Sequence, residues 1–135
     1  MIGKSKKVIA RGFTLLELMT VISIIIILAA ITLPQYQKTI TATRESVLRY
    51  DLHRMRELID QFAADKGRLP QSIDELVTEG YMREVPVDPM TGKNDWELRS
   101  SYDASDAGSW GGENVFDVRS KSKAKALNGE QYSDW

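Results

Sequence analysis

The sequence predicts an α+β protein in which one long N-terminal α-helix packs against a small antiparallel sheet in a C-terminal head. Three observations predict this class. An apolar run over residues 13–33 is followed by a helix-period pattern as far as residue 65. The rest of the chain is rich in turn residues. It also holds two short segments of strand character, and a sheet against the helix would bury the apolar faces of both.

Residues 13–33, FTLLELMTVISIIIILAAITL, contain one charge, Glu17. A helix of this length rises about 32 Å, enough to cross the roughly 30 Å hydrocarbon core of a bilayer. The first twelve residues hold four basic side chains and no acid, so the positive-inside rule predicts a cytoplasmic N-terminus and an exported remainder. No second segment of similar hydrophobicity follows, which predicts a single-pass membrane protein.

Three interpretations of this segment compete. It resembles a secretory signal peptide with small residues at Ala29-Ala30, an uncleaved anchor, or a leader that is cut before the apolar run. Glu17 separates them, because a carboxylate inside an apolar helix costs about 2.5–3.5 kcal/mol on insertion scales and a plain anchor has no use for it. A charge tolerated near the membrane surface is the structural alternative.

The start of the apolar run resembles the recognition site of type IV prepilins and type II secretion pseudopilins, in the string Arg11-Gly12-Phe13-Thr14-Leu15-Leu16-Glu17. The resemblance implies that a prepilin peptidase cuts between Gly12 and Phe13 and methylates the new N-terminus. Residues 1–12 are then a cleaved leader. The resemblance also implies that residues 13–33 form a transmembrane helix of the bacterial inner membrane first and a filament core afterwards, with the C-terminal head in the periplasm.

The same resemblance implies an assembly role for Glu17 in a helical homopolymer. Cleavage creates a positive amine on Phe13, which the Glu17 of a neighbouring subunit would meet inside an apolar core. Low dielectric strengthens such a pair, and an unpaired charge there is costly. The implied partners are further copies of the chain, an inner-membrane assembly platform with its ATPase, minor pseudopilins, and membrane lipid before assembly.

Residues 34–66 are predicted to continue the helix past a kink at Pro34. Apolar residues with spacings of 4, 3, 4 and 3, broadened by Val47 and Leu58, predict one buried face: Leu48, Leu52, Met55, Ile59 and Phe62. The charged residues around them predict a solvated face: Arg49, Arg54, Arg56, Glu57 and Asp60. With Gly67 as its cap, the helix would span residues 13–65, about 80 Å. A coiled-coil dimer is the alternative, although only about two heptads repeat cleanly.

The head is predicted over residues 67–135. A linker at residues 68–71 precedes a capping box, Ser72-Ile73-Asp74-Glu75, which predicts a short helix that ends at Gly80. Its inward residues would be Ile73, Leu76 and Val77. Residues 81–95 hold prolines and a glycine and predict an irregular connection.

Two strands are predicted after this connection. Alternating apolar and polar residues predict a half-buried strand over residues 96–102, and residues 115–119 predict a second strand, with a loop over 103–114 between them. The polar residues 120–135 predict an irregular C-terminal segment, in which Tyr132 and Trp135 would pin the chain to the head.

The head resembles the major pseudopilins of type II secretion. The shared features are a leucine-proline turn, the short helix, Val85-Pro86-Val87-Asp88-Pro89 with Gly92 after it, and the ending Tyr132-Ser133-Asp134-Trp135. Major type IV pilins commonly close a C-terminal loop with a disulfide, and this chain has no cysteine. That departure favours the pseudopilins.

The resemblance also implies calcium in the C-terminal region, although no cofactor is required. Oxygen donors that suit calcium are Asp117, Ser120, Ser122, Asn128 and Glu130. A second set is Asp103, Asp106 and Glu113 in the preceding loop. Neither set has the spacing of an EF-hand, and Lys121, Lys123 and Lys125 crowd the first one. Acids that only keep loops hydrated are the alternative.

Composition limits the remaining functions. Without the four basic residues of the leader, 14 basic residues face 19 acidic ones, which disfavours nucleic-acid binding. The absence of cysteine excludes thiol catalysis and cysteine-bound zinc, and the single histidine, His53, cannot form a histidine-rich metal site. No phosphate loop, nucleophile elbow or His-Glu metal motif is present, so no enzyme is predicted.

The sequence therefore predicts a structural subunit, a pseudopilin that polymerises into a periplasmic filament for protein secretion. A type IV pilin or minor pilin for adhesion, motility or DNA uptake is the alternative within the family. A membrane-anchored periplasmic binding module, with no polymer, is the alternative from another class.

Overall fold

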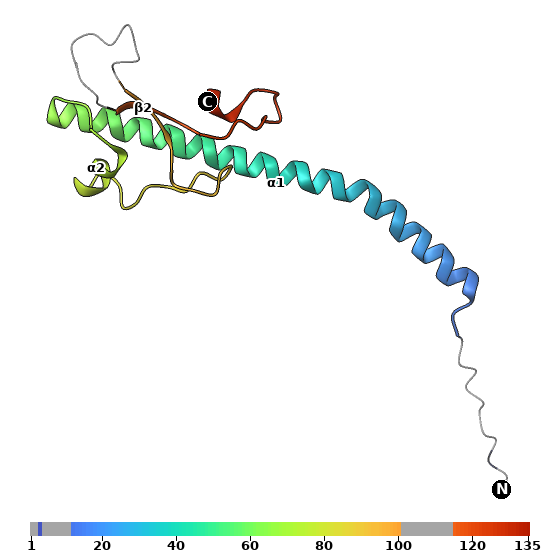
Figure 1. Ribbon diagram of the computed structural model, residues 1–135. Coiled ribbons are helices and arrows are strands. Elements are labelled where there is room, and N and C mark those ends of the chain that lie inside the picture. Colours follow the sequence, from blue (N-terminus) through green and yellow to red (C-terminus); the bar gives the residue numbers. More distant parts are fainter. Residues whose placement is uncertain (1–2, 4–11, 101–114) are drawn as a thin grey trace. The chain divides into compact units, whose positions relative to one another are not determined.

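The structure, a computed structural model, describes residues 3, 12–100 and 115–135. The chain divides into two units, Met1–Gln37 and Lys38–Trp135, which are described separately. Figure 1 shows the order of the elements: the helix α1 (Leu15–Lys66), the helix α2 (Ile73–Thr78), the strands β1 (Glu97–Ser100) and β2 (Val115–Arg119), and the 3-10 turn η1 (Tyr132–Asp134). The predicted α+β class and the long N-terminal helix are confirmed.

The helix α1 has 52 residues and includes Pro34, as the sequence predicts. Proline donates no amide hydrogen, so one bond of the helix is lost at that position. The helix ends where Gly67 takes a φ of 67°, a left-handed conformation that glycine adopts without a steric penalty. The amide of Gly67 still donates to the carbonyl of Ala63 at 2.9 Å.

The second half of α1 forms one side of the hydrophobic core of the Lys38–Trp135 unit. All five residues of the predicted buried face are buried there, together with Leu58: Leu48, Leu52, Met55, Ile59 and Phe62. Val47 was expected to widen this face and is 45% exposed, so that expectation is wrong. The other core elements cover only one side of α1, and Val47 lies about 100° around the helix from Leu48.

The predicted solvated face of α1 needs one correction. Arg54 and Glu57 are exposed and form an ion pair at 3.3 Å, and the exposed His53 approaches Glu57 at 3.2 Å. Arg56 instead is half-buried, because its guanidinium reaches across to Asp117 on β2. Arg56 therefore belongs to the interior contacts of the head.

The helix α2 begins at the predicted cap, because the hydroxyl of Ser72 accepts the amide hydrogen of Glu75 at 3.3 Å. The return bond of the capping box differs from the prediction: Glu75 accepts from the amide of Gln71, at 2.6 Å, one residue before the cap. Ile73 and Leu76 are buried and Val77 is half-buried. Residues 81–95 form the predicted irregular connection, which contains no helix or strand.

The sheet has two antiparallel strands, β1 and β2, with Leu98 opposite Val118 and a register shift between Arg99 and Ser100. Val115 and Val118 of β2 are buried in the core. The predicted first strand is present over Glu97–Ser100, but the expected burial at Leu98 is wrong, since Leu98 is 42% exposed. Trp96, which lies just before the strand, is buried instead. The indole nitrogen of Trp96 donates a hydrogen bond to the carbonyl of Pro86 at 2.9 Å. Positions 101–114, which include the end of the predicted first strand and the loop, lie outside the described residues.

Candidate functional site

The predicted cleavage site lies directly before α1. Gly12, Phe13 and Thr14 are outside the helix and exposed, and the side chain of Phe13 is 83% exposed. A protease needs an accessible backbone outside a helix at the bond that it cuts, and the peptide between Gly12 and Phe13 has both properties. The geometry is therefore compatible with cleavage there.

Thr14 is the N-cap of α1. Its hydroxyl accepts the amide hydrogen of Glu17 at 3.2 Å, and its carbonyl accepts that of Leu18 at 3.1 Å. Thr14 and Glu17 thus have the spacing of a capping box, the same pattern that predicted the start of α2. The capping box of Thr14 and Glu17 was not among the sequence predictions, although Ser72 and Glu75 have the same spacing.

This cap gives Glu17 a local reason to be present. An acid in the first turn of a helix faces the positive end of the helix dipole, which favours it by a few tenths to about 1 kcal/mol. That gain is smaller than the about 2.5–3.5 kcal/mol cost of a carboxylate in an apolar environment. A positive partner for Glu17 would have to supply the difference.

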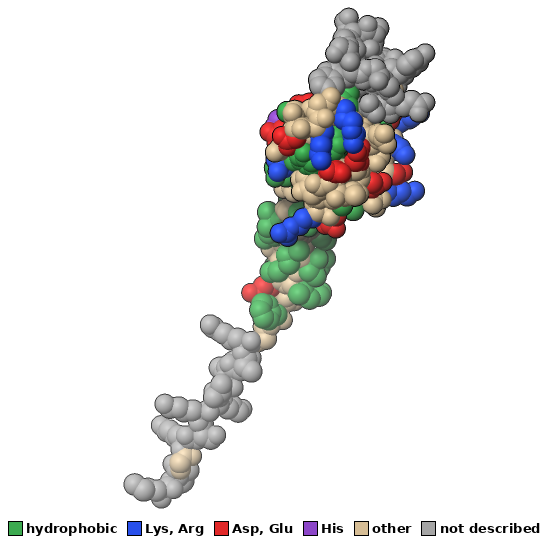
Figure 2. Space-filling view, turned by 90° about the vertical axis from the view of Figure 1, so that its left-hand side faces the viewer, with side chains coloured by type: hydrophobic (Ala, Val, Ile, Leu, Met, Phe, Trp, Pro, Cys, Tyr) green, Lys and Arg blue, Asp and Glu red, His purple; other side chains and the backbone are tan. Residues whose placement is uncertain are grey.

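Within the described residues, no other part of the chain packs over the first half of α1. Its large apolar side chains are all substantially exposed, including Leu16, Ile26 and Leu33. Figure 2 shows hydrophobic side chains gathered over the visible face of this segment. In the described part of the chain, α1 is the one helix that is long and apolar enough to cross a membrane. Its exposed apolar surface requires lipid or another protein.

A buried carboxylate, Glu45, ties the C-terminal segment to α1. Its Oε1 accepts the amide hydrogen of Leu127 at 2.8 Å and the hydroxyl hydrogen of Tyr132 at 2.9 Å. Burial and the hydrogen bond to Glu45 raise the pKa of the Tyr132 hydroxyl. The prediction that Tyr132 pins the chain end is confirmed, and Glu45 is the partner that the sequence did not identify.

Trp135 is held to the same helix by two arginines. The guanidinium of Arg49 lies 4.2 Å from the centre of the Trp135 ring, and Nη2 of Arg56 donates to the Trp135 carbonyl at 2.8 Å. Nε of Arg56 also donates to Asp117 at 2.7 Å. One signal could have identified Arg56: it follows Leu52 by four residues, which places it at the edge of the buried face.

The predicted calcium ligands belong to three separate hydrogen-bonded groups. Asp117 pairs with Arg56 and Arg119. The hydroxyl of Ser120 donates to the buried Asp88 and accepts from the amide of Ser122.

The third group joins Asn128 and Glu130, whose side chains bond at 2.8 Å. Within the described residues no three acidic or histidine side chains gather as a metal site would require. The second set, Asp103, Asp106 and Glu113, lies outside those residues, so a calcium site remains a prediction.

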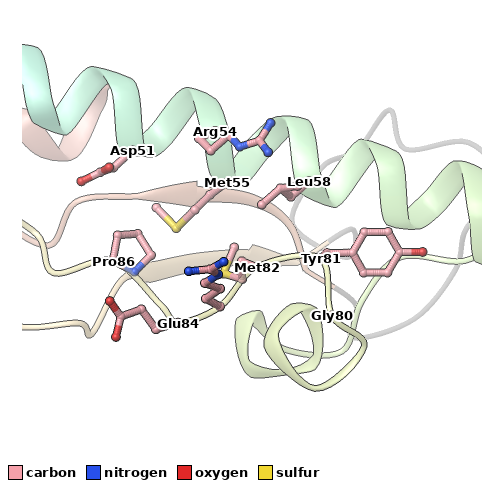
Figure 3. Close-up of a pocket in the computed structure, with 10 residues that line it drawn as sticks. Asp51, Arg54, Met55, Leu58, Gly80, Tyr81, Met82, Glu84 and Pro86 are labelled. Atoms are coloured by element: carbon pink, nitrogen blue, oxygen red, sulfur yellow. The ribbon is translucent and has the colours of Figure 1, made fainter.

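A groove of about 580 Å³ lies between α1 and residues 80–86 (Figure 3). Its apolar lining includes Met55 and Leu58 from α1 and Met82 and Pro86 from the facing segment. Asp51 lines its rim, and partial burial and the nearby Asp88 raise the pKa of this carboxyl. The groove has no nucleophile paired with a base, so nothing in its geometry supports catalysis.

Comparison with known proteins identifies related chains. A type II secretion system core protein G of Klebsiella michiganensis is 34% identical over 107 residues, which span 67% of this chain and 73% of the relative. A core protein G of Escherichia coli K12 is 30% identical over 119 residues, or 73% of this chain and 81% of the relative. No family model and no solved structure matches the chain.

A second group of relatives matches a shorter part. The type IV major fimbrial protein FimA of Dichelobacter nodosus is 44% identical over 59 residues, only 44% of this chain and 38% of the relative. The core proteins G match over a much greater length, and the long N-terminal helix with a small antiparallel sheet agrees with a pilin-like architecture. The chain therefore belongs to the family of the type II secretion system core protein G, the major pseudopilins.

Proposed function

We propose that this chain is a pseudopilin subunit, which polymerises into a periplasmic filament that acts in type II protein secretion. The observation that supports this most directly is the similarity to core proteins G over most of both chains. The uncovered apolar surface of α1 gives the polymer a physical basis, because neighbouring helices would bury it.

The proposed life of the subunit begins in the inner membrane, with the N-terminus in the cytoplasm and the head in the periplasm. A prepilin peptidase cuts between Gly12 and Phe13, and residues 13–33 remain in lipid until assembly. At the filament base, an assembly platform and its ATPase extract subunits, and the growing fibre pushes cargo outward. The work is mechanical, and the chain itself performs no catalysis.

In the polymer, Glu17 pairs with the Phe13 amine of a neighbouring subunit. The exposure of Phe13 and the position of Glu17 in the first helical turn support this pairing, since both groups lie on the part of the chain that neighbours can reach. Calcium in the C-terminal region, through the oxygen donors named above, stays a secondary proposal.

A pilin of the type IV fimbrial class is the second candidate function, and the 44% identity to FimA over 59 residues favours it. The absence of cysteine disfavours the disulfide-closed head of major type IV pilins. Deletion of the gene separates these functions: loss of secreted enzymes supports the pseudopilin, and loss of surface fimbriae or twitching supports the pilin.

Electron microscopy of material sheared from cells that overproduce the full chain tests polymerisation. We expect helical fibres, and the intact mass of their subunit should begin at Phe13 with one added methyl group. A chain that keeps its first twelve residues, or one that starts after Ala30, contradicts the proposed processing. Cells that make mature protein without any fibre would support the membrane-anchored binding module.

A further inference from the structure

The C-terminal segment contains a tight turn over residues 126–130, which belongs to the red end of the ribbon in Figure 1. The amide of Gly129 donates to the carbonyl of Ala126 at 2.9 Å, and the amide of Ala126 donates to the carbonyl of Glu130 at 2.8 Å. Gly129 takes a φ of 90°, a conformation that glycine adopts without a steric penalty. The pair Asn128-Gly129 therefore lies at the tip of a closed turn.

An asparagine that is followed by glycine can lose ammonia without a catalyst. The backbone nitrogen of the glycine attacks the side-chain carbonyl carbon of the asparagine, and a new C–N bond forms as the bond to the side-chain nitrogen breaks. That nitrogen leaves with the electron pair, takes up the proton that the glycine amide loses, and departs as ammonia. Water then opens the cyclic imide at either carbonyl, which leaves an aspartate with a normal or an isomerised backbone.

This reaction singles out one asparagine of the sequence. Asn128 is the one that glycine follows. Asn94 and Asn114 precede Asp95 and Val115. The side chain of such a following residue hinders the attack, whereas a glycine leaves its nitrogen open. Asn128 is therefore the asparagine that this reaction favours.

The folded turn holds both reacting groups in other bonds. Nδ2 of Asn128 donates to Oε2 of Glu130 at 2.8 Å, and Oδ1 of Asn128 accepts the amide hydrogen of Glu130 at 3.0 Å. The amide hydrogen of Gly129 is bonded to Ala126. For the attack, the side chain must turn away from Glu130 and the amide of Gly129 must lose its proton, and both changes break these bonds. The reaction therefore requires the turn to open.

The turn can open while the core stays folded. Residues 127–130 are all exposed, and an exposed loop tip opens at a much smaller free energy than the whole domain. The buried residues on either side, Ala126 and Tyr132, belong to the hydrophobic core and keep the segment attached. Short openings of this turn are thus available to the folded head.

We propose that Asn128 is a site of spontaneous deamidation, and that the hydrogen bonds of the turn restrain the reaction in the folded head. The inference does not rest on the proposed polymer, because it follows from the chemistry and contacts of one turn. It assigns to the C-terminal segment a covalent change that needs no enzyme and no cofactor.

The product weakens the attachment of the C-terminal segment. The new carboxylate cannot donate to Glu130 and places a second negative charge beside it. In the isomerised product the backbone is longer by one methylene group. That length has to be taken up between Lys125 and Gln131, which bridge across the turn, and next to Leu127, whose amide donates to Glu45.

Peptide mass spectrometry of the full chain in detergent tests the proposal. The chain is incubated at one mildly alkaline pH, once folded and once in urea that unfolds the head, and then digested briefly with trypsin. The peptide that begins at Ala126 reports Asn128, and the peptide that begins at Asn94 is the internal control. We expect Asn128 to react at least about tenfold faster in the unfolded chain, the ratio for a turn that is open about a tenth of the time or less. Asn94 should react more slowly than Asn128 in urea.

Variants assign the restraint to the turn. Glu130→Ala removes the carboxylate that Nδ2 of Asn128 reaches, and it should raise the rate in the folded head severalfold while the rate in urea stays the same. The matched control is Glu97→Ala at an exposed position of β1, which should change neither rate. Asn128→Gln should abolish the reaction at this position in both states, because its longer side chain would have to close a larger ring.

A second measurement tests the effect of the product. Asn128→Asp introduces the carboxylate of the normal product, whereas Asn128→Ser keeps a short polar side chain without the charge. Thermal unfolding should occur at a lower temperature for Asn128→Asp than for Asn128→Ser. Equal unfolding temperatures would contradict the predicted weakening.

Three results of the mass measurement would overturn the proposal. An unchanged Asn128 in the unfolded chain would show that the position is not a deamidation site. Equal rates in the folded and unfolded chain would show that the turn gives no protection. A folded rate that Glu130→Ala does not raise would show that the bond from Asn128 to Glu130 is not part of the restraint.

Discussion

The hydroxyl of Tyr132 donates to the carboxylate of Glu45 across 87 positions of the chain, at 2.9 Å. Both residues are buried, and the same carboxylate oxygen accepts the amide hydrogen of Leu127. The polar C-terminal segment thus gains its position from one acid on α1. Beside the two-stranded sheet of the described residues, such long-range polar contacts hold the C-terminal segment in place.

The first prediction concerns this buried carboxylate. Glu45→Ala should lower the free energy of unfolding of the head by about 2 kcal/mol, because the buried Tyr132 hydroxyl and the partly buried amide of Leu127 both lose their acceptor. Tyr132→Phe should cost less, about 1 kcal/mol, since Glu45 keeps its bond to Leu127. Tryptophan fluorescence of the detergent-solubilised full chain during urea titration measures both. The double variant should cost less than the sum of the two single ones, and strict additivity would contradict the coupling.

The second prediction concerns Arg56, whose planar guanidinium bonds Asp117 on β2 and the backbone carbonyls of Val118 and Trp135. A lysine has one compact ammonium and cannot reproduce this fork. Arg56→Lys should therefore destabilise the head by about 1–2 kcal/mol although the charge is kept. The matched control is Arg54→Lys on the exposed face, where the ion pair with Glu57 contributes little. Equal effects of the two variants in thermal unfolding would show that the fork is not important.

The third prediction is a pH dependence set by Glu75. The hydrogen bond from Arg68 is the main cause that holds the pKa of Glu75 below its usual value of 4.5, with a further bond from the amide of Gln71. A depressed folded pKa stabilises the head above the unfolded pKa, and this stability is lost as the pH falls through the folded value. The unfolding temperature should therefore drop between about pH 5 and pH 3.

Two variants check that assignment. Glu75→Gln keeps an acceptor for the Gln71 amide and should flatten the acidic part of the profile. Arg68→Gln removes the largest cause of the shift and should flatten it to a similar degree. An unchanged slope in both would mean that other carboxylates set the acid sensitivity of the head.

Features that depend on residues close together in the sequence were predictable, whereas those that depend on distant residues were not. The core face of α1, the cap of α2 and the residues of β2 are local or periodic features, and all were predictable. The contact of Glu45 was not, since its partner Tyr132 lies 87 positions away. The position of Arg56 after Leu52 could have indicated partial burial, but its partner Asp117 lies 61 positions away and no local pattern identifies it. The alternating pattern of β1 suggested one buried face, but Leu98 is 42% exposed although its partner Val118 is buried. The burial of Leu98 depends on cover from other parts of the chain, which the local pattern does not reveal.

In the candidate site, too, the local features were predictable from the sequence. The leader, the cleavage point and Glu17 are local motifs, and the structure adds the exposure of Gly12, Phe13 and Glu17 and the cap at Thr14. That cap could have been found, because Thr14 and Glu17 have the same spacing as Ser72 and Glu75. Because of this cap, Glu17 is expected to have two roles: it stabilises the start of α1, and it takes part in the contact between subunits.

The fourth prediction separates these two roles of Glu17. Glutamine at the third helical position still completes a capping box, so Glu17→Gln removes the charge and keeps the helix start. Thr14→Val does the reverse: it removes the cap, at a cost of about 1 kcal/mol, and keeps the charge. If Glu17 pairs with the Phe13 amine of a neighbour, Glu17→Gln and Glu17→Val should both insert in the membrane and be cleaved but yield few fibres. Thr14→Val should yield nearly normal fibres, because subunit packing can restore a frayed first turn.

Fibre yield by sedimentation and cleavage by intact mass measure the two steps separately. The opposite pattern, with normal fibres from Glu17→Gln and few from Thr14→Val, would assign Glu17 to the helix start alone and remove its role between subunits.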